Sequence, residues 1–231
     1  MSAPFFIFKN ISSLDMNCII ENELPEITPA KRETETTVTG RSGELTQTFN
    51  DYDSYDYPVS FTILDYEKIE DVKRWLRGSG QLITHNDLDK YRTVKIKQEP
   101  REYQNEWDTF WTVDVTFRCE PFRRQINEPT VTLTAGTNAI FNNGNEESFP
   151  VFRFKVTSGN VVLTINNETF TILSPPANTE FTLNTENGIC YADGTYIRTT
   201  GEFPRLIEGD NNIFLSGSIV LAEMDKRSLF L

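Results

Sequence analysis

Few residue types in this chain have the number and spacing that catalysis or metal binding requires. There is one histidine, His85, in the stretch LITHNDLDKY. A lone imidazole gives a zinc site or a Ser-His-Asp arrangement little to build on, so we predict that His85 lies exposed at a hairpin edge. The three cysteines, Cys18, Cys119 and Cys190, are far apart and form no Cys-x-x-Cys pair. This pattern is typical of small buried side chains in a reduced compartment.

Acidic residues offer a second kind of chemistry. Asp51, Asp53 and Asp56 stand close together in NDYDSYDYP. The spacing faintly resembles a calcium-binding loop, but the glycine and terminal glutamate of that pattern are missing, which favours a solvated acidic turn. The chain has 34 Asp and Glu residues, and sequence does not reveal which of them meet in space. A carboxylate pair for glycoside hydrolysis therefore stays open.

Aromatic side chains in the later half of the chain could stack on sugar rings: Phe141, Phe152, Tyr191 and Tyr196. Strand alternation instead predicts most of them in a hydrophobic core. With no nucleophile paired to a base and no phosphate-binding loop, we predict that the chain is not an enzyme. We also predict that it binds no cofactor and no metal.

The net charge limits the possible partners. It is −12, with an isoelectric point near 4.6, so the surface repels phosphate backbones and binding of nucleic acid by charge is disfavoured. Repulsion of this kind would be useful if DNA passed nearby without sticking. No run of apolar residues is long enough for a membrane span, and the start, MSAPFFIFKNISS, lacks the pattern of a secretory signal.

The composition divides the chain near residue 127. Residues 1–126 are richer in charged side chains, whereas residues 127–231 are richer in Thr, Asn, Phe, Val and Ile, a strand-and-turn composition. In this later section short apolar runs alternate with turn signals such as Asp193-Gly194, at a spacing of about ten residues that predicts an antiparallel sandwich.

The earlier section is predicted to hold strands and one helix. The helix is expected over 66–78, where Ile69, Val72 and Leu76 share a stripe and Gly78 follows as a stop. Two alternating strands, within 91–98 and 107–122, bracket the polar turn 99–106 and predict a hairpin that could extend beyond its sheet. The proline-containing stretch 24–49 is interpreted as a long polar segment.

Several constrained stretches resemble, in order, the distal tail proteins of phages with long non-contractile tails. They are ITPAKRETETTVTGRSGEL, IEDVKRWLRGSGQL, DKYRTVKIK, FWTVDVTFRCEPF, IFNNGNEESFPVFRF and GEFPRLIEGDNNI. The matches run from about residue 25 to 220. In Val38-Thr39-Gly40-Arg41-Ser42-Gly43 the proline and aspartate usual in that family are absent.

The resemblance implies a mainly β fold. A tail-tube-like β-sandwich with a flanking helix and a projecting hairpin would comprise 1–126 together with about 213–231, and a galectin-like sandwich, 127–212, would be inserted before the final strand. It also implies a structural protein at the distal end of the tail of a phage or prophage. This protein would form a homohexameric ring between the tail tube protein and the tail-tip, baseplate or receptor-binding proteins, and DNA would pass through the ring without specific binding.

The resemblance, with the glycine and charge patterns, gives three sets of candidate residues. The ring-interface candidates are Gly40, Arg41, Gly43 and Trp75. The acidic candidates for the channel or the seams between subunits are Asp51, Asp53, Asp56, Glu99, Glu102 and Glu106. The candidates for returning the chain from the second domain to the first are Phe203, Pro204, Leu206 and Gly209. For Arg41, a hydrogen bond that caps the local turn remains an equal alternative.

Two other functions stay open at this point. The second sandwich could be a carbohydrate-binding module that recognises host cell-wall saccharide, although a galectin-like fold alone does not carry that function. A tail-lysin-type hydrolase is the third hypothesis.

Overall fold

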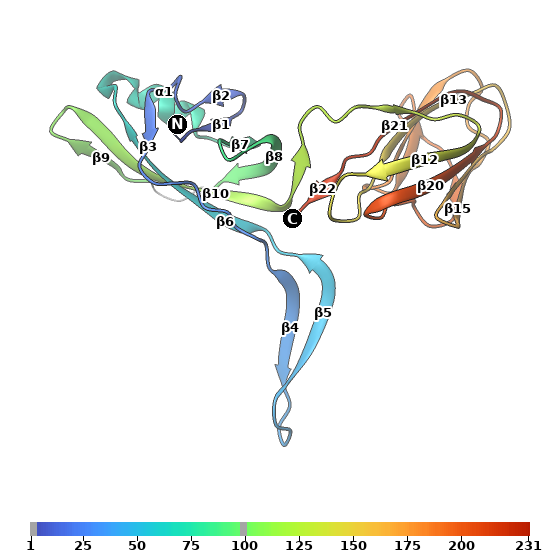
Figure 1. Ribbon diagram of the computed structural model, residues 1–231, viewed down its shortest axis with the longest axis horizontal. Coiled ribbons are helices and arrows are strands. Elements are labelled where there is room, and N and C mark those ends of the chain that lie inside the picture. Colours follow the sequence, from blue (N-terminus) through green and yellow to red (C-terminus); the bar gives the residue numbers. More distant parts are fainter. Residues whose placement is uncertain (1–3, 98–100) are drawn as a thin grey trace. The chain divides into compact units, whose positions relative to one another are not determined.

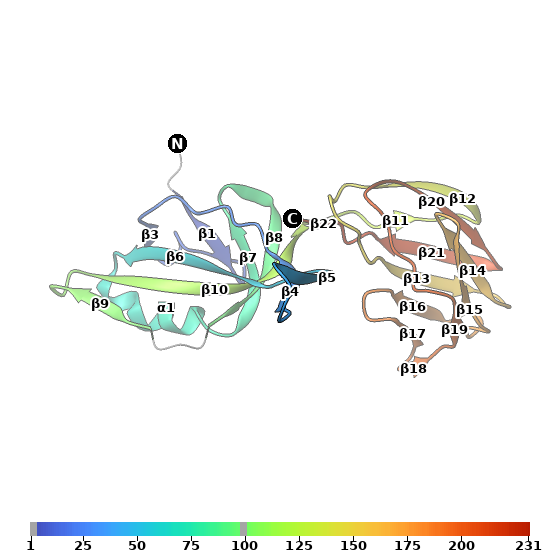
Figure 2. The ribbon, with the colours of Figure 1, turned by 90° about the horizontal axis from the view of Figure 1, so that it is seen from below.

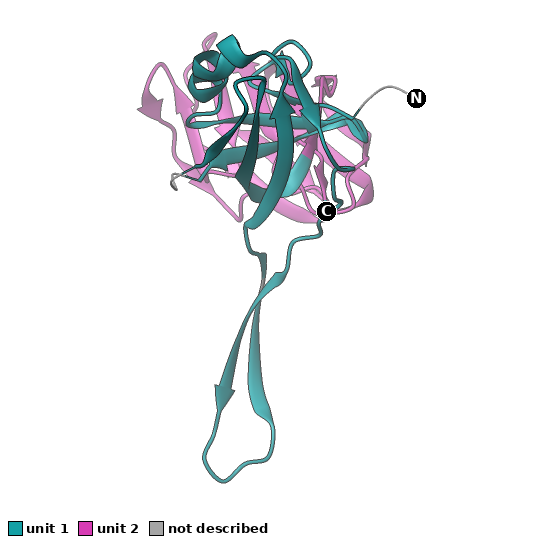
Figure 3. Cartoon of the chain, turned by 90° about the vertical axis from the view of Figure 1, so that its left-hand side faces the viewer, with its two compact units in different colours: residues 1–123, 231 teal, residues 124–230 magenta. Residues whose placement is uncertain are grey.

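The computed structural model describes residues 4–97 and 101–231. The chain forms two compact units, shown in different colours in Figure 3: residues 1–123 with Leu231, and residues 124–230. Both are built almost entirely from strands. In the described part of the chain, the only α-helix is α1 (Ile69–Trp75).

Unit 1 is built on a large antiparallel sheet (Figure 1). The strand order is β2-β1-β7-β8-β10-β6-β3, and β9 and β22 also pair with β10. The strands are β1 (Phe6–Phe8), β2 (Ile11–Ser12), β3 (Cys18–Ile20), β6 (Tyr55–Ile63), β7 (Ser79–Thr84), β8 (Asp87–Ile96), β9 (Tyr103–Glu106), β10 (Phe110–Gln125) and β22 (Leu229–Phe230).

The alternation predicted for the long strands is confirmed. In β10 the side chains of Val113, Val115 and Phe117 are buried, and Asp114 between them is exposed. In β6, which pairs with β10, Phe61 and Ile63 lie in the same core. The sheet therefore has one face in the core and one face in solvent, as expected for an antiparallel sheet.

The helix covers the core face of the sheet (Figure 2), and the stripe predicted for it packs there. Val72 and Leu76 are fully buried, and Ile69 is partly buried against the same cluster. The helix is shorter than predicted, because residues 66–68 form a 3-10 turn, η1 (Tyr66–Lys68), and regular geometry ends at Trp75. Gly78 has a φ of +71°, which suits the left-handed stop expected there.

A second, two-stranded sheet lies in unit 1 within the stretch that was interpreted as a long polar segment. It consists of β4 (Lys31–Thr37) and β5 (Glu44–Tyr52), which project from the rest of the unit (Figure 3). The strands predicted within 91–98 and 107–122 are neighbours in the large sheet, as β8 and β10, which confirms their pairing. The stretch predicted as a turn between them contains β9, and the hairpin that projects is β4–β5 instead. All described side chains from residue 31 to 49 are exposed, so no buried face marks this hairpin in the sequence.

Unit 2 is a sandwich of two antiparallel sheets (Figure 2), in the orders β11-β21-β13-β16-β17-β18 and β12-β20-β14-β15-β19. Large apolar side chains from both sheets, such as Phe152 and Phe170, form one core. The strands are β11 (Val131–Thr132), β12 (Gly136–Asn142), β13 (Val151–Val156), β14 (Val161–Ile165), β15 (Glu168–Ile172), β16 (Glu180–Asn184), β17 (Ile189–Ala192), β18 (Thr195–Tyr196), β19 (Thr199–Thr200), β20 (Gly209–Ser216) and β21 (Ile219–Asp225).

The end of the chain differs from the expected domain limits. Residues 213–231 were expected in the first domain, but β20 pairs with β12 and β14, and β21 pairs with β11 and β13, all in unit 2. The cause is burial, because Ile213, Leu215 and Met224 belong to the core of the sandwich. Of the strands within residues 213–231, β22 is the one that pairs with β10 of the large sheet. The last residues of β10 already belong to unit 2.

No helix in the part of the chain that the structure describes is long and apolar enough to cross a membrane.

Candidate assembly surfaces

The β4–β5 hairpin has two chemically different faces. Directly paired residues of an antiparallel ladder point to the same side, and Glu33 pairs with Thr48, Glu35 with Thr46 and Thr37 with Glu44. One face therefore carries three glutamates among threonines. None of the three has an ion-pair partner among the described residues. The opposite face carries Leu45 and Phe49, which are 44% and 49% exposed.

The tip of the hairpin holds three of the ring-interface candidates. Gly40 and Gly43 have φ values of +86° and +84°, which disfavour any other residue. A Cβ atom at either position would meet nothing within 4 Å, so this chain itself does not fill the space beside them. The backbone N–H of Arg41 donates to the oxygen of Val38 at 3.1 Å. The guanidinium group of Arg41 has no hydrogen bond or ion pair within the described residues, which leaves it available to a partner.

Trp75, the fourth ring-interface candidate, is a core residue. Its side chain is stacked on Phe6 at 5.4 Å between ring centroids, and the residue is 5% exposed. An interface role for Trp75 is therefore not supported. The sequence pattern had already placed it beside the apolar stripe of the helix, and burial follows from that position.

The three clustered aspartates are ion-paired near the base of the hairpin. Arg32 lies 2.8 Å from Asp51 and 3.1 Å from Asp53. Asp56 lies 2.6 Å from Lys97 and 3.0 Å from Arg118. The hydrogen bond from Lys97 lowers the pKa of Asp56 below its ordinary value. Neighbouring cations thus offset the negative charge of this cluster, which reduces its value as a repulsive lining.

The remaining acidic candidates fall in three environments. Glu99 lies outside the described residues. Glu106 ends β9, opposite Phe110. Glu102 lines a shallow depression of about 250 Å³ on the solvent face of the sheet, together with Glu21 and Asp114. Sequence reasoning missed Glu21 as a site residue, and nothing in its surroundings along the chain marks it.

Two of the three carboxylates of this depression accept hydrogen bonds from hydroxyl groups. Ser60 donates to Asp114, and Thr62 donates to Glu21 at 2.6 Å. No cation pairs with Glu21, Glu102 or Asp114 among the described residues. The depression is therefore a negatively charged recess.

A buried charged residue that sequence reasoning did not single out is Arg92. It is 1% exposed and lies in β8, where it shares the buried face of the strand with the core residues Val94 and Ile96. Its Nε donates to the hydroxyl of Tyr55 at 3.0 Å, and a terminal nitrogen lies 3.4 Å from Glu26. Since Glu26 precedes β4 and Tyr55 follows β5, this guanidinium group ties together the two chain segments at the base of the hairpin.

The candidates for returning the chain lie inside unit 2. Leu206 is fully buried in the core of the sandwich, and Phe203 packs on Phe170 at 5.0 Å between ring centroids. The stretch ends in Gly209, the first residue of β20. Phe203, Pro204, Leu206 and Gly209 therefore belong to a loop that closes one end of this unit, and the predicted return role does not fit. The side chain of Asn211 fixes the loop through two 2.9 Å hydrogen bonds with the backbone of Ile207.

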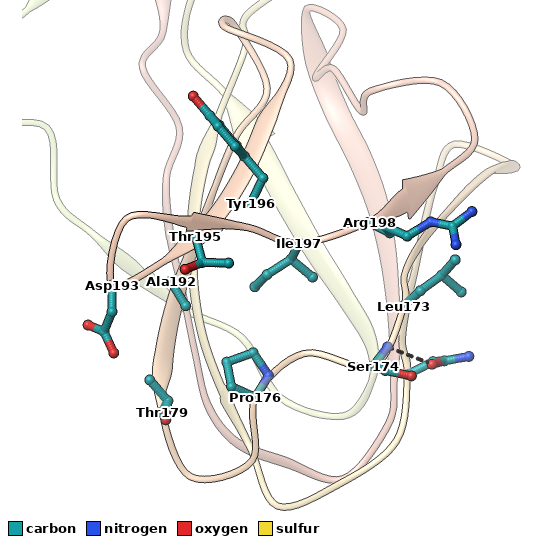
Figure 4. A pocket seen from close by; sticks show the side chains of 11 residues that line it. Leu173, Ser174, Pro176, Thr179, Ala192, Asp193, Thr195, Tyr196, Ile197 and Arg198 are labelled. Carbon is teal, nitrogen blue, oxygen red and sulfur yellow. Dashed lines mark hydrogen bonds between the residues drawn. The ribbon is translucent and has the colours of Figure 1, made fainter.

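Unit 2 also contains a cavity of about 770 Å³ (Figure 4). Ala192, Pro176 and Ile197 point toward one another in it, whereas Tyr196 and Arg198 extend away from its centre. Of the aromatic residues considered for sugar stacking, Phe152 is buried as predicted. Phe141, Tyr191 and Tyr196 are 57%, 38% and 75% exposed, so the prediction that most of the four lie in the core is wrong.

The groups first considered for catalysis are the three cysteines and His85. Cys18, Cys119 and Cys190 are buried and free, as predicted, and burial raises the pKa of each thiol to about 12. His85 follows β7, as expected for a hairpin edge, but its side chain is only 15% exposed, so the predicted exposure is wrong. One of its ring nitrogens lies 2.7 Å from Glu23. Within the described ranges, no group of three His, Cys, Asp or Glu residues could hold a metal ion.

The fold of this chain is similar to that of solved phage structures. No family model and no curated protein matches the sequence. The chain is similar to structures of the phage P2 baseplate in its activated conformation, one with Ca and one with Sr, each with a TM-score of 0.50 and 8% identity. The match with Ca covers 97% of each chain, and the match with Sr covers 96% of this chain and 97% of the other. The architecture therefore occurs among phage baseplate components.

The SPP1 Dit (gp 19.1) protein is a more similar structure, described as a paradigm of the hub adsorption apparatus in phages that infect Gram-positive bacteria. The TM-score is 0.78 with 11% identity, and the match covers 100% of both chains. The mainly β fold expected from the distal tail protein resemblance is confirmed.

Proposed function

We propose that this chain is a structural hub protein of a phage or prophage tail. The observation that carries the proposal is the match to the SPP1 Dit protein, which covers the full length of both chains at a TM-score of 0.78. Six tail-protein stretches in the same order along the sequence support it independently. A likeness in fold alone would leave the function open. The six stretches in the same order restrict the choice of function to tail proteins.

In this proposal the chain assembles into a homohexameric ring. A two-stranded hairpin is marginally stable in water on its own, and the β4–β5 hairpin buries none of its described side chains from residue 31 to 49. A neighbouring subunit would provide the missing contacts. A ring formed from one kind of chain requires two different, complementary surfaces on each subunit.

DNA would pass through the ring without binding to it. The net charge of −12 keeps phosphate backbones away. Glu33, Glu35 and Glu44, on one hairpin face, have no ion-pair partner among the described residues. They are therefore better suited to line the channel than Asp51, Asp53 and Asp56, which have cationic partners.

The partners of the ring would be the tail tube protein on one side and tail-tip, baseplate or receptor-binding proteins on the other. The location would be the distal end of the tail. The protein would act by connecting these parts, without a catalytic step or a cofactor.

Labelling of intact phage particles tests this function. A gold-conjugated antibody against the chain should mark the distal end of the tail in negative-stain images, and the chain should be found among the proteins of purified particles. Label on the capsid, or absence of the chain from purified particles, would overturn the proposal.

A second candidate function is recognition of host cell-wall saccharide by unit 2. It rests on Tyr196, which is 75% exposed at the rim of the 770 Å³ cavity, because exposed aromatic rings suit stacking on sugars. Titration of the full chain with host cell-wall polysaccharide tests it. Saturable binding that Tyr196→Ala abolishes supports this function, and the absence of binding removes it.

A further inference from the structure

We infer that the hairpin tip of one subunit docks into the acidic depression on the next subunit, so that Arg41 pairs with Glu21, Glu102 and Asp114 of a second copy. The inference rests on the proposed ring and assigns its two complementary surfaces. Both surfaces belong to unit 1, so the argument is independent of unit 2.

The hairpin surface needs a partner. Leu45 and Phe49 lie on one exposed face, and Val38 near the tip is 43% exposed. Arg41 lies in the turn between β4 and β5, and its guanidinium group has no partner in the described part of this chain. A matching surface must therefore offer apolar side chains close to unpaired negative charge.

The solvent face around β3 offers that combination. The depression of about 250 Å³ is lined by Glu21, Glu102 and Asp114, none of which has a cationic partner within the described residues. Two exposed apolar side chains lie close to its lining residues along the chain: Ile19 at 44% and Leu64 at 52%. Ile19 pairs with Thr62, whose hydroxyl donates to Glu21, so apolar and acidic groups are neighbours there.

The occupant is a second copy because the two surfaces complement each other in charge and in apolar character. Guanidinium is the cation best suited to pairing with carboxylates, since its planar donors match their geometry. β3 is also an edge strand of its sheet, so one of its sides is open to a neighbour. A contact between two different surfaces of identical chains is heterologous and can close into a ring.

Charge exchange tests the docking. In the full chain, Arg41→Glu should raise the concentration at which rings dissociate roughly tenfold or more, since like charges would then face each other. Adding Glu102→Lys to Arg41→Glu should bring the concentration at which rings dissociate most of the way back to that of the unmodified chain. Arg74→Glu serves as the matched control, because Arg74 is an exposed arginine on α1, and it should leave ring formation unchanged.

Cross-linking gives an independent reading. The native cysteines are buried, so a variant with Arg41→Cys and Glu102→Cys should form disulfide-linked oligomers up to the hexamer, whereas each single change should form none larger than a dimer. If the unmodified chain forms rings but Arg41→Glu does too and no ladder appears, the docking is wrong and the proposed function stands. If the unmodified chain forms no ring even with tail tube protein present, the ring proposal and this inference both fail.

Discussion

The indole N–H of Trp75 donates a hydrogen bond of 2.8 Å to the backbone oxygen of Phe8. This bond joins α1 to β1 inside the core of unit 1, and the stacking of Trp75 on Phe6 strengthens the same junction. The short helix is therefore fixed to the sheet by a polar and an apolar contact at once.

Removing this junction should destabilise unit 1. Trp75→Ala is expected to lower the free energy of unfolding by about 3–5 kcal/mol, because it leaves a cavity and an unpaired carbonyl group. Urea unfolding followed by circular dichroism measures the change. Trp107→Ala is the matched control, since Trp107 is 94% exposed, and it should cost less than about 0.5 kcal/mol. Equal stability of the two variants would show that Trp75 is not a core residue.

Arg92 should be a second strong contributor to stability. Arg92→Ala removes a buried charge that contacts Tyr55, Thr84 and Glu26, and breaking a buried pair of this kind costs about 3–5 kcal/mol. Lys95→Ala, an exposed position in the same strand, should change stability by less than about 0.5 kcal/mol. Hydrogen exchange should also rise at the base of the hairpin in Arg92→Ala. Unchanged exchange there would contradict the role assigned to Arg92.

The ion pairs of Asp56 predict a pH dependence. Its pKa is lowered in the folded state, chiefly by the hydrogen bond from Lys97. The stabilisation is therefore present above the unfolded pKa of 3.8 and is lost as the pH falls through the lower folded value. Because Asp56 is partly exposed, screening limits the effect to about 1 kcal/mol or less.

Urea unfolding of the unmodified chain and of Asp56→Asn at pH 7, 5 and 3 measures this effect. The unmodified chain should be more stable at pH 7 and 5, and the difference should shrink at pH 3. A difference that stays constant over this range would mean that the carboxylate charge of Asp56 does not stabilise the fold.

The acidic face of the hairpin should keep DNA from binding. Replacing Glu33, Glu35 and Glu44 together by Lys should let assembled rings bind a labelled DNA duplex at low salt. The binding should weaken steeply as salt rises, because it depends on released counterions. Fluorescence anisotropy at about 50 and 200 mM salt follows it.

A matched control separates position from net charge. Glu168, Glu180 and Glu208 are exposed glutamates of unit 2, and changing all three to Lys alters the net charge by the same amount. If this control binds DNA as tightly as the hairpin variant, the hairpin face has no special relation to the DNA path.

The sequence predicted the core strands well because burial imposes a pattern. In β10, alternation separates Val113 and Val115 from Asp114, and the separate stripe of Ile69, Val72 and Leu76 predicts the flanking helix. The hairpin was missed for the opposite reason, because all described side chains from residue 31 to 49 are exposed and no buried apolar face marks the two strands.

The roles of single residues were harder to predict from the sequence, since they depend on contacts between residues that are distant along the chain. The burial of Arg92 depends on Glu26 and Tyr55, which are 66 and 37 residues away. The recess at Glu21 forms only when β3, β6 and β10 lie side by side. The glycine and proline motifs predicted rigid turns near residues 201–217, but they did not reveal that these turns belong to unit 2.

The mass of the purified chain in solution tests the central claim most directly, if light scattering is combined with negative-stain imaging and repeated with tail tube protein present. The account predicts particles of about 160 kDa, six copies of the 26.6 kDa chain, with a central hole. A chain that stays monomeric both alone and with the tube protein, or that forms closed dimers with no hole, would contradict it.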